Sequence, residues 1–358
     1  MPINITKTQS ADLEQSLTID RGSLGRGPGG PATPEPSSIS ADVRQTISSE
    51  RRCMAMIAVV VFTLVLNFAH TVQIDPLAAS TNLGAVKRAD GLRLSVSGKD
   101  AQPVVDIALP GHSESDCAIE VIFPEHVTAR RHGDVDAEHL YLFKGGPIGA
   151  RPPWRRIGNS LEYQRELSNA VHMLARVTLE SDGLLFHYEF TNGSDRKYDM
   201  IYAVTDPRLK SVFHDVRLER TYVHHSNGFD LLASETPARL TLPLEKWLPA
   251  RYLASFTWPV PLKLVERRND GITYYNKSRK VDEPLIATLS LDRTWVVASF
   301  TRETGNVWSN PELTCQHVDP QVPLPGQQKA TMEVKMLVLR GSLDEAHRRM
   351  LEQRNSLK

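Results

Sequence analysis

The sequence has no excess of charge of either sign. It holds 42 basic and 42 acidic side chains in 358 residues, so no net field attracts nucleic acid or another polyanion. We therefore predict no nucleic-acid partner. Charged residues make up 23% and hydrophobic residues 41% of the chain, as in ordinary globular proteins, and the part after residue 90 is long enough for one large core.

The signatures of common catalytic sites are also missing. The sequence contains no G-x-S-x-G, no H-E-x-x-H, no Walker loop and no cysteine pairs at zinc-binding spacing. This excludes the common hydrolases, metalloproteases and nucleotide-binding enzymes. Chemistry assembled from distant strands stays open, so the sequence does not decide whether the protein is an enzyme, and it predicts no cofactor.

Large apolar side chains are nearly absent from the N-terminal region. The stretch "GSLGRGPGGPATPEPSSIS", residues 22–40, is rich in glycine, proline and serine. Such a composition cannot bury enough apolar surface to offset the entropy lost on ordering. We predict that residues 1–50 are disordered.

The longest apolar run is "CMAMIAVVVFTLVLNFA", residues 53–69, directly after Arg51 and Arg52. A basic flank and such a run predict a signal peptide or a membrane anchor over residues 51–74, with a linker at 75–90. The strongly apolar centre is shorter than the roughly 20 residues of a spanning helix, yet no cleavage site with small residues follows it. Both interpretations therefore stay open, with a buried core helix as the alternative.

This segment also predicts the compartment. Because positive charges stay on the cytoplasmic side, we expect the residues beyond 75 to lie outside the cytoplasm, periplasmic or secreted. If the segment is not cleaved, residues 53–69 hold the protein in the membrane.

Cysteine is scarce. Only Cys117 and Cys315 lie in the part expected to be exported. They can form one disulfide there, or they can be two buried free thiols, as is common in a domain of this size.

From residue 91 to 358 the dominant period is two. Short alternating runs bounded by glycine, proline, asparagine or aspartate predict antiparallel strands. We expect strands at 92–98, 103–111, 117–124, 139–143, 239–243, 271–277, 284–291, 294–300 and 330–341, and three neighbouring strands within 169–207. The chain shows neither strand–helix alternation nor a fixed repeat, so we predict an all-β fold, a large antiparallel β-sandwich.

One clear helix is expected, over residues 342–354. Ser342 can serve as its N-cap, acidic residues follow in the first turn and basic residues come later. We predict that this C-terminal helix closes the domain.

The densest polar cluster is "VFHDVRLERTYVHHSNGFD", residues 212–230. On an extended strand Arg220, Tyr222 and His224 share one face, which can bind a polyhydroxylated or anionic ligand. A solvated face with cross-strand ion pairs is the alternative. We include His214 as a catalytic candidate with His224, and His225 as a ligand-binding candidate.

Histidines also raise the question of a metal site. Imidazole is a common transition-metal ligand, and His214, His224, His225 and His317 are available. Adjacent residues on a strand point to opposite faces, so His224 and His225 do not suit one ion. The sequence therefore predicts no metal.

Tryptophans beside proline or asparagine form a further group. Trp154 lies in "RPPWRR", Trp258 in "FTWPVP" and Trp308 in "NVWSNPELTCQH", which also holds Asn310 and Glu312. Exposed aromatic rings suit the apolar faces of sugars, while amides and carboxylates bind hydroxyls. Packing within the domain is the alternative for all three tryptophans.

Two stretches resemble the galactose-mutarotase-like superfamily of large β-sandwiches. They are "LESDGLLFHYEFTNGSDRKYDM" (179–200) and "NVWSNPELTCQHVDPQVPLPGQQKATMEVKMLV" (306–338). The resemblance implies a sugar ligand and proton transfer at its anomeric hydroxyl. Where the family has a late catalytic glutamate this chain has His317, which can serve as a base, and the family's imidazole acid falls on His214 or His224.

We therefore expect an exported β-sandwich that binds carbohydrate, with mutarotase-, epimerase- or lyase-like chemistry as the catalytic hypothesis. The alternative is a non-catalytic structural or protein-interaction domain of the cell envelope. The sequence names neither the sugar nor the oligomeric state.

A reporter fusion tests the predicted compartment. An enzyme that is active only outside the cytoplasm should be active when it is fused after residue 90, because the basic flank keeps the preceding residues inside. Reporter activity confined to the cytoplasm would contradict export.

Overall fold

The computed structural model describes residues 83–97, 102–113, 116–140, 142, 152–167 and 170–358. The predictions of a disordered region at 1–50 and of a signal peptide or anchor at 51–74 lie outside these residues. Within the described ranges, no helix is long and apolar enough to cross a membrane.

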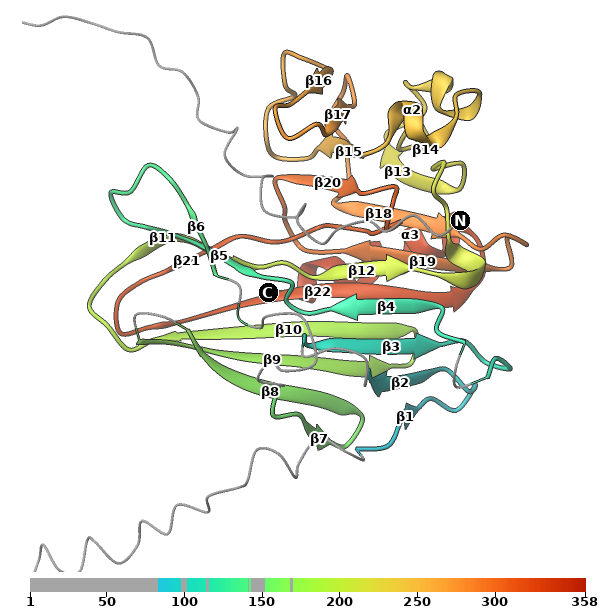
Figure 1. Ribbon diagram of the computed structural model, residues 1–358. Coiled ribbons are helices and arrows are strands. Elements are labelled where there is room, and N and C mark those ends of the chain that lie inside the picture. Colours follow the sequence, from blue (N-terminus) through green and yellow to red (C-terminus); the bar gives the residue numbers. More distant parts are fainter. Residues whose placement is uncertain (1–82, 98–101, 114–115, 141, 143–151, 168–169) are drawn as a thin grey trace, which may run out of the picture. The chain divides into compact units, whose positions relative to one another are not determined.

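The largest sheet of the described residues has nine strands in the order β14-β13-β18-β19-β22-β10-β9-β8-β7 (Figure 1). Its strands are β7 (Arg155–Ile157), β8 (Ser160–Leu167), β9 (Val171–Glu180), β10 (Gly183–Asn192), β13 (Thr221–His225), β14 (Gly228–Leu231), β18 (Leu285–Leu289), β19 (Trp295–Phe300) and β22 (Lys329–Arg340). All of its pairings are antiparallel.

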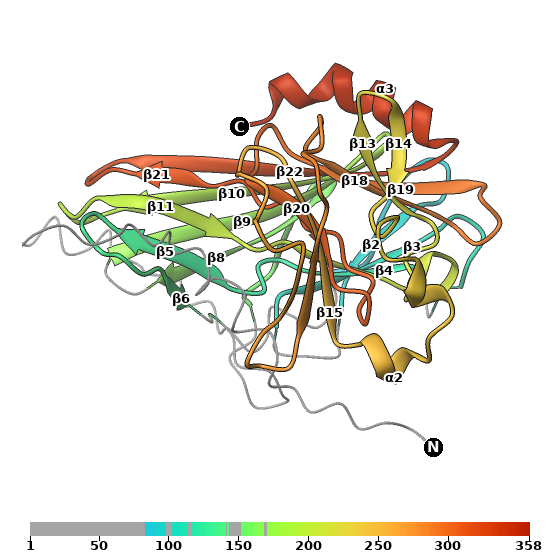
Figure 2. The same cartoon turned by 90° about the horizontal axis from the view of Figure 1, so that it is seen from above.

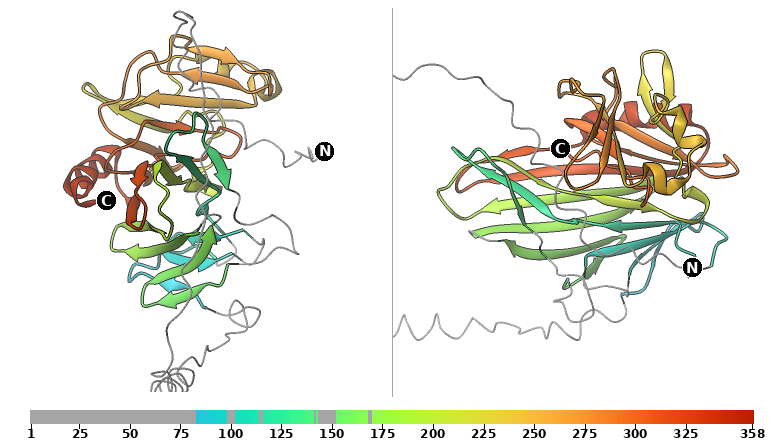
Figure 3. Two further views of the ribbon diagram at one scale, coloured as in Figure 1. Left: turned by 90° about the vertical axis from the view of Figure 1, so that its left-hand side faces the viewer. Right: turned by 45° about the horizontal axis from the view of Figure 1, so that its top comes forward.

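Three smaller sheets complete the described domain. The first, in the order β1-β2-β3-β4-β12, faces the nine-stranded sheet. It consists of β1 (Val86–Lys87), β2 (Arg93–Val96), β3 (Val104–Ala108), β4 (Ile119–Ile122) and β12 (Asp206–Leu209). The second contains β21 (Val322–Leu324), β11 (Tyr198–Ala203), β5 (Val127–Arg131) and β6 (Glu138–Leu140). The third contains β16 (Val265–Arg267), β17 (Thr273–Asn276), β15 (Ala250–Ser255) and β20 (Asn306–Ser309), and its orange strands lie on the side of the nine-stranded sheet where β18 is (Figures 1 and 3).

A short segment, residues 314–317, leaves a turn at Thr314 and connects the five-stranded sheet to the sheet that contains β20. Cys315 bridges to Arg208 of β12, and His317 bridges to Trp308 of β20. The backbone of His317 exchanges two hydrogen bonds with Trp308, at 2.9 and 3.1 Å. We call this segment, together with β12 and β20, the seam.

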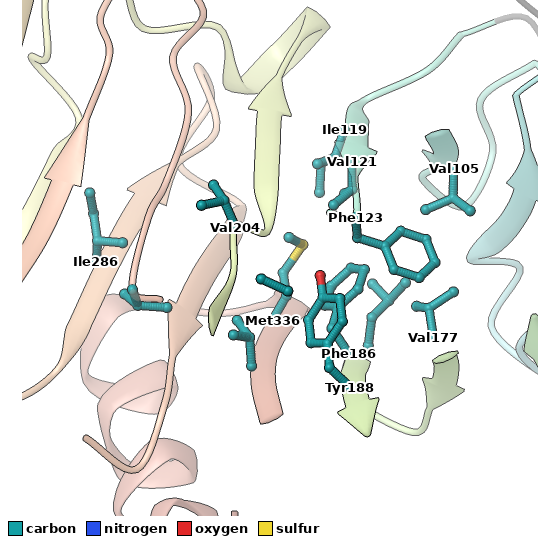
Figure 4. Packing of buried hydrophobic residues seen from close by; sticks show 14 of the residues in the cluster. Val105, Ile119, Val121, Phe123, Val177, Phe186, Tyr188, Val204, Ile286 and Met336 are labelled. Carbon is teal, nitrogen blue, oxygen red and sulfur yellow. The ribbon is translucent and has the colours of Figure 1, made fainter. Parts of the chain in front are cut away.

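The core fills the space between the nine-stranded sheet and the five-stranded sheet. Alternation along β9 and β10 directs every second side chain inward. Figure 4 shows Val105 and Phe123 of the five-stranded side packing toward Val177, Phe186 and Met336 of the nine-stranded sheet. The predicted all-β sandwich is confirmed by this layered arrangement.

Helix α3 (Leu343–Gln353) covers the opposite face of the nine-stranded sheet, as Figure 2 shows. Ser342 caps it, because its side chain accepts the Glu345 N–H as predicted. Ala346 and Met350 are fully buried against a second apolar cluster formed by the outer faces of β18, β19 and β22. The remaining helical turns are η2 (Ser211–Phe213), η3 (Pro237–Leu240), α2 (Leu244–Trp247) and η4 (Arg354–Ser356).

Two local predictions are corrected. Residues 239–243 do not form a strand. The buried guanidinium of Arg239 donates to the carbonyls of Arg217 at 2.8 Å and Thr236 at 2.9 Å, which holds the chain in the turn η3. In addition, β1 lies within the stretch 75–90 predicted as a linker. Val86 is buried in the core, so the sandwich begins before residue 91.

A buried ammonium group fixes α3 to the sheet. Lys335 of β22 is 1% exposed, and its Nζ donates to the carboxylates of Glu180 and, at 2.7 Å, Asp182. The second oxygen of Asp182 accepts from Gln353 of α3 at 2.6 Å. Asp182 therefore joins the end of the helix to the sheet through charge-assisted hydrogen bonds.

We predict that Lys335→Met lowers the free energy of unfolding by about 3–5 kcal/mol, because it leaves Asp182 buried without its main cation. Lys329→Met on the same strand is the control. Its side chain is 62% exposed and pairs with Glu189, so its loss should cost at most about 1 kcal/mol. Urea denaturation of both variants measures the difference, and equal small losses would contradict the assigned role of Lys335.

Candidate functional site

The seam has an inner and an outer face. Gln316 points into the sandwich, where its amide bonds the hydroxyls of Thr288 and Ser299 of the nine-stranded sheet, each at 2.8 Å. Because successive side chains of an extended segment alternate, Cys315 and His317 lie on the opposite, outer face.

Five side chains gather on this outer face. Asp206 and Arg208 come from β12, Cys315 and His317 from the connecting segment, and Trp308 from β20. Bridged residues point to the same side of a sheet, so the two bridges of the seam bring these groups together. The sequence analysis identified Trp308 and His317 as site candidates, and it missed Asp206 and Arg208.

Asp206 is the most constrained charge of the group. It is 2% exposed, its Oδ2 accepts from Arg208 Nε at 2.7 Å, and its Oδ1 lies 3.4 Å from His317 Nε2. Burial alone raises the pKa of the Asp206 carboxyl, but the Arg208 guanidinium and the His317 imidazolium outweigh burial and hold that pKa well below its usual range. The carboxylate is therefore ionised although it is buried.

His317 lies between two carboxylates. Its Nδ1 is 3.5 Å from Asp319 Oδ2, on the side away from Asp206. Burial alone lowers the pKa of His317, but the Cys315 sulfur and the carboxylates of Asp206 and Asp319 raise it well above its ordinary value. A charged, 1% exposed imidazolium is a hydrogen-bond donor and not a free base, so His317 does not have the state required for the predicted role of base.

The indole of Trp308 is stacked on His317. The two rings lie 3.7 Å apart at an interplanar angle of 4°. Trp308 keeps part of its surface exposed, and the imidazole covers one face of the indole. The buried charges thus hold an aromatic surface in one orientation.

Polar amides flank this indole. Leu253 is the direct cross-strand partner of Trp308, and Asn276 is the partner of Leu253 on the next strand. Asn306 precedes Trp308 by two positions and so shares its face. All four residues are partly exposed, whereas Val307 between them is fully buried. We call Leu253, Asn276, Asn306 and Trp308 the Trp308 platform.

Further charged groups continue along the outer face from Arg208. Glu125 Oε1 lies 3.7 Å from Arg208, and Lys210 donates to Glu120 at 2.5 Å. Beside Glu125, burial together with His139 and His317 lowers the pKa of His126 to about 3, so this imidazole is neutral. No pattern in the sequence singles out Glu125 or His126.

The three catalytic candidates are in different places. His317 lies in the seam. His214 is exposed, and its Nδ1 is 3.5 Å from Thr314 at the start of the connecting segment. His224 is stacked on His347 of α3, with ring centroids 3.9 Å apart, and its contacts with α3 and with Phe229 are not shared with the seam.

The other residues of the polar cluster stabilise local structure. The guanidinium of Arg220 donates to the backbone carbonyls of Leu289, at 2.7 Å, and Val212, at 3.3 Å. His225 Nδ1 lies 2.9 Å from the Lys280 carbonyl, and Tyr222 packs on the apolar cluster under α3.

Asn310, Glu312 and Trp258 also make local contacts. The Asn310 side chain accepts the Glu312 N–H at 3.2 Å, which closes the turn after β20. Glu312 Oε1 accepts the Ala250 N–H at 3.0 Å. Trp258 lies so close to Gly305 that a Cβ there would be 2.2 Å from the indole.

The two cysteines of the domain are free thiols with different neighbours. Cys117 donates to the Asp106 carboxylate at 3.3 Å, and the Cys315 sulfur accepts the Asn310 N–H at 3.2 Å. Burial and the Asp106 carboxylate raise the pKa of Cys117 to about 12. The structure therefore does not contain the disulfide that the sequence left open.

One set of side chains could hold a metal ion. The ligand atoms of Asp206, Cys315 and His317 all lie within 4.8 Å of one another, and all three residues are buried. Of the histidines considered from the sequence, only His317 belongs to this set.

No family model matches the chain, and no curated protein matches it either. Among solved structures, it is similar to a galactose mutarotase related enzyme from Lactobacillus acidophilus, at 9% identity and a TM-score of 0.38, over 73% of this chain and 98% of that one. A galactose mutarotase-like protein from Lactobacillus casei gives 8% identity and a TM-score of 0.38, over 72% and 99%.

A third structure is an alpha-N-acetylgalactosaminidase from Bifidobacterium bifidum, at 10% identity and a TM-score of 0.41, over 76% of this chain and 39% of that one. The two mutarotase-like structures are of the kind that the two sequence stretches resemble. The β-sandwich fold of this chain is assigned from the strand pairings of its own structure.

Thiol labelling tests the state of the cysteines. After denaturation without reductant, both Cys117 and Cys315 should react fully with a maleimide, located by peptide mass spectrometry. In the native protein both should react slowly, because Cys315 is 1% exposed and the Cys117 thiol stays protonated. If the denatured chain is labelled only after reductant is added, Cys117 and Cys315 form a disulfide.

Proposed function

We propose that this protein binds a carbohydrate on the outer face of the seam, with the sugar ring stacked on Trp308. The observation that carries the proposal is the fixed, partly exposed indole, held by His317 at 3.7 Å and flanked by amide side chains. Aromatic rings bind the apolar C–H faces of sugars, and neighbouring polar groups bind the hydroxyls.

The platform is suited to this ligand because it is already ordered. Stacking on His317 restricts the indole before any ligand arrives, so binding costs little side-chain entropy. The amides of Asn276 and Asn306 offer both donors and acceptors, as hydroxyl recognition requires. Arg208 and Glu125 extend the polar surface beyond the platform.

Binding is better supported than catalysis. The charged His317 lies behind the indole and is 1% exposed, so it does not reach a sugar stacked on the outer side of Trp308. Mutarotase-, epimerase- or lyase-like turnover therefore requires other groups, and Glu125, 3.7 Å from Arg208, and the neutral His126 are candidates.

The proposal includes an extracytoplasmic location. The apolar run at 53–69 after Arg51 and Arg52 supports export, with the domain beyond residue 83 presented to glycans outside the cytoplasm. A non-catalytic interaction domain of the cell envelope is the alternative, and it requires no glycan.

We predict that Trp308→Ala abolishes most glycan affinity, because it removes the central contact surface. Its effect on unfolding should stay below the roughly 3–5 kcal/mol that a core tryptophan costs when replaced by alanine. Trp154→Ala is the matched control, since Trp154 is 3% exposed and packs on Phe123 and Tyr163 in the core. This control should lose stability and keep affinity in the molecules that remain folded.

Both variants and the parent are measured on a glycan array and by thermal unfolding, and each bound glycan is also followed by polarimetry for anomer exchange. Failure of the parent to bind any glycan, with equal destabilisation in both variants, would make Trp308 a packing residue and favour the envelope interaction domain.

A further inference from the structure

The three donor atoms at the seam form a set with a defined chemistry. Asp206 supplies a carboxylate oxygen, Cys315 a sulfur and His317 a ring nitrogen, all within 4.8 Å of one another. Carboxylate, thiolate and imidazole together are donors that zinc uses, whereas calcium and magnesium take oxygen ligands. The set therefore points to a transition-metal ion.

The distance between two of these donors suits a shared ion. Asp206 Oδ1 and His317 Nε2 are 3.4 Å apart, which is longer than a good hydrogen bond between a charged nitrogen and a carboxylate. Two ligands at zinc bond lengths of about 2.0–2.1 Å and a tetrahedral angle are about 3.4 Å apart. The pair thus has the spacing of two ligands on one ion, and Oδ1 has a lone pair available.

Neighbouring groups orient each of the three donors, as the residues around the ligands of a metal site do. Arg208 binds the other oxygen of Asp206 at 2.7 Å, which leaves Oδ1 toward His317. Asp319 Oδ2 lies 3.5 Å from the far nitrogen of His317. The Asn310 N–H points at the Cys315 sulfur at 3.2 Å. Carboxylates behind histidine ligands and hydrogen bonds to ligating groups are regular features of metal sites.

We propose that Asp206 Oδ1, Cys315 Sγ and His317 Nε2 bind one divalent transition-metal ion, of which zinc is the best match. Ligating sulfur and nitrogen atoms carry no proton, so any proton on Cys315 Sγ or His317 Nε2 passes to solvent when the ion binds. A fourth position remains for water.

This site has a structural consequence for Trp308. The ion fixes the imidazole on which the indole is stacked, so metal binding rigidifies the Trp308 platform. The proposal goes beyond carbohydrate binding and does not depend on it, because the metal is measured without any sugar.

The test uses the full chain, stripped with a chelator and then exposed to Zn²⁺ or Co²⁺. After gel filtration, elemental analysis should find one zinc per chain. Co²⁺ should produce the near-ultraviolet charge-transfer band of a cobalt–thiolate bond. Zinc should also raise the unfolding temperature in a concentration-dependent way, because the ion binds the folded chain.

Variants locate the ion. Cys315→Ser should lose the cobalt–thiolate band, and Asp206→Asn should lose the retained zinc. Cys117→Ser is the matched control, because that thiol bonds Asp106 and lies outside the donor set, and it should leave both signals unchanged. Asp319→Asn keeps all three ligands and should weaken zinc binding about 10- to 100-fold at the same stoichiometry.

Three results would overturn the proposal. They are a parent chain that retains no zinc, a cobalt–thiolate band that survives in Cys315→Ser, and a band that disappears in Cys117→Ser. Circular dichroism of the metal-free proteins checks that each variant folds. If Cys315→Ser does not fold, the cobalt spectrum of the parent chain and the zinc affinity of Asp319→Asn still test the site. A zinc affinity of Asp319→Asn equal to that of the parent would also contradict it.

Discussion

The ionised carboxylate of Asp206, buried where the sheets meet, is the constraint on which the arrangement of the outer face depends. An isolated charge in such a place costs several kcal/mol, so its neighbours must compensate it. Arg208 does so from the same strand at 2.7 Å, and His317 from the connecting segment at 3.4 Å. Because these two cations have to be near Asp206, the segment 314–317 must lie against β12.

The position of Trp308 follows from that requirement. His317 is held by carboxylates on both sides, and its ring supports the indole of β20 at 3.7 Å. The backbone bonds between His317 and Trp308 continue the pairing from the five-stranded sheet into the sheet of β15 and β20. One buried charge network therefore joins two sheets and presents one aromatic surface.

Several polar side chains elsewhere in the domain form hydrogen bonds with backbone groups. Arg220 and Arg239 satisfy carbonyl groups in irregular segments, and Glu312 accepts an N–H at the start of β15. Buried backbone groups need such partners wherever strands end. A cluster of charged and histidine residues in a sequence therefore has two physical origins, a ligand site or an irregular backbone, and the cluster at 212–230 belongs mainly to the second.

Local patterns in the sequence were sufficient for the all-β class, for strands such as β9, β10 and β22, and for α3 with its Ser342 cap, because alternation and capping act over a few residues. They also singled out Trp308 and His317, which lie against each other in the structure. They could not predict that Asp206 and Arg208 join them, or that Arg220 and His224 do not. About 110 positions separate Asp206 from His317 in the chain, and only the pairing of β12 with the connecting segment brings the two together. The charge state of His317 was likewise decided by tertiary structure, since a pKa depends on the burial and the neighbouring charges that folding creates.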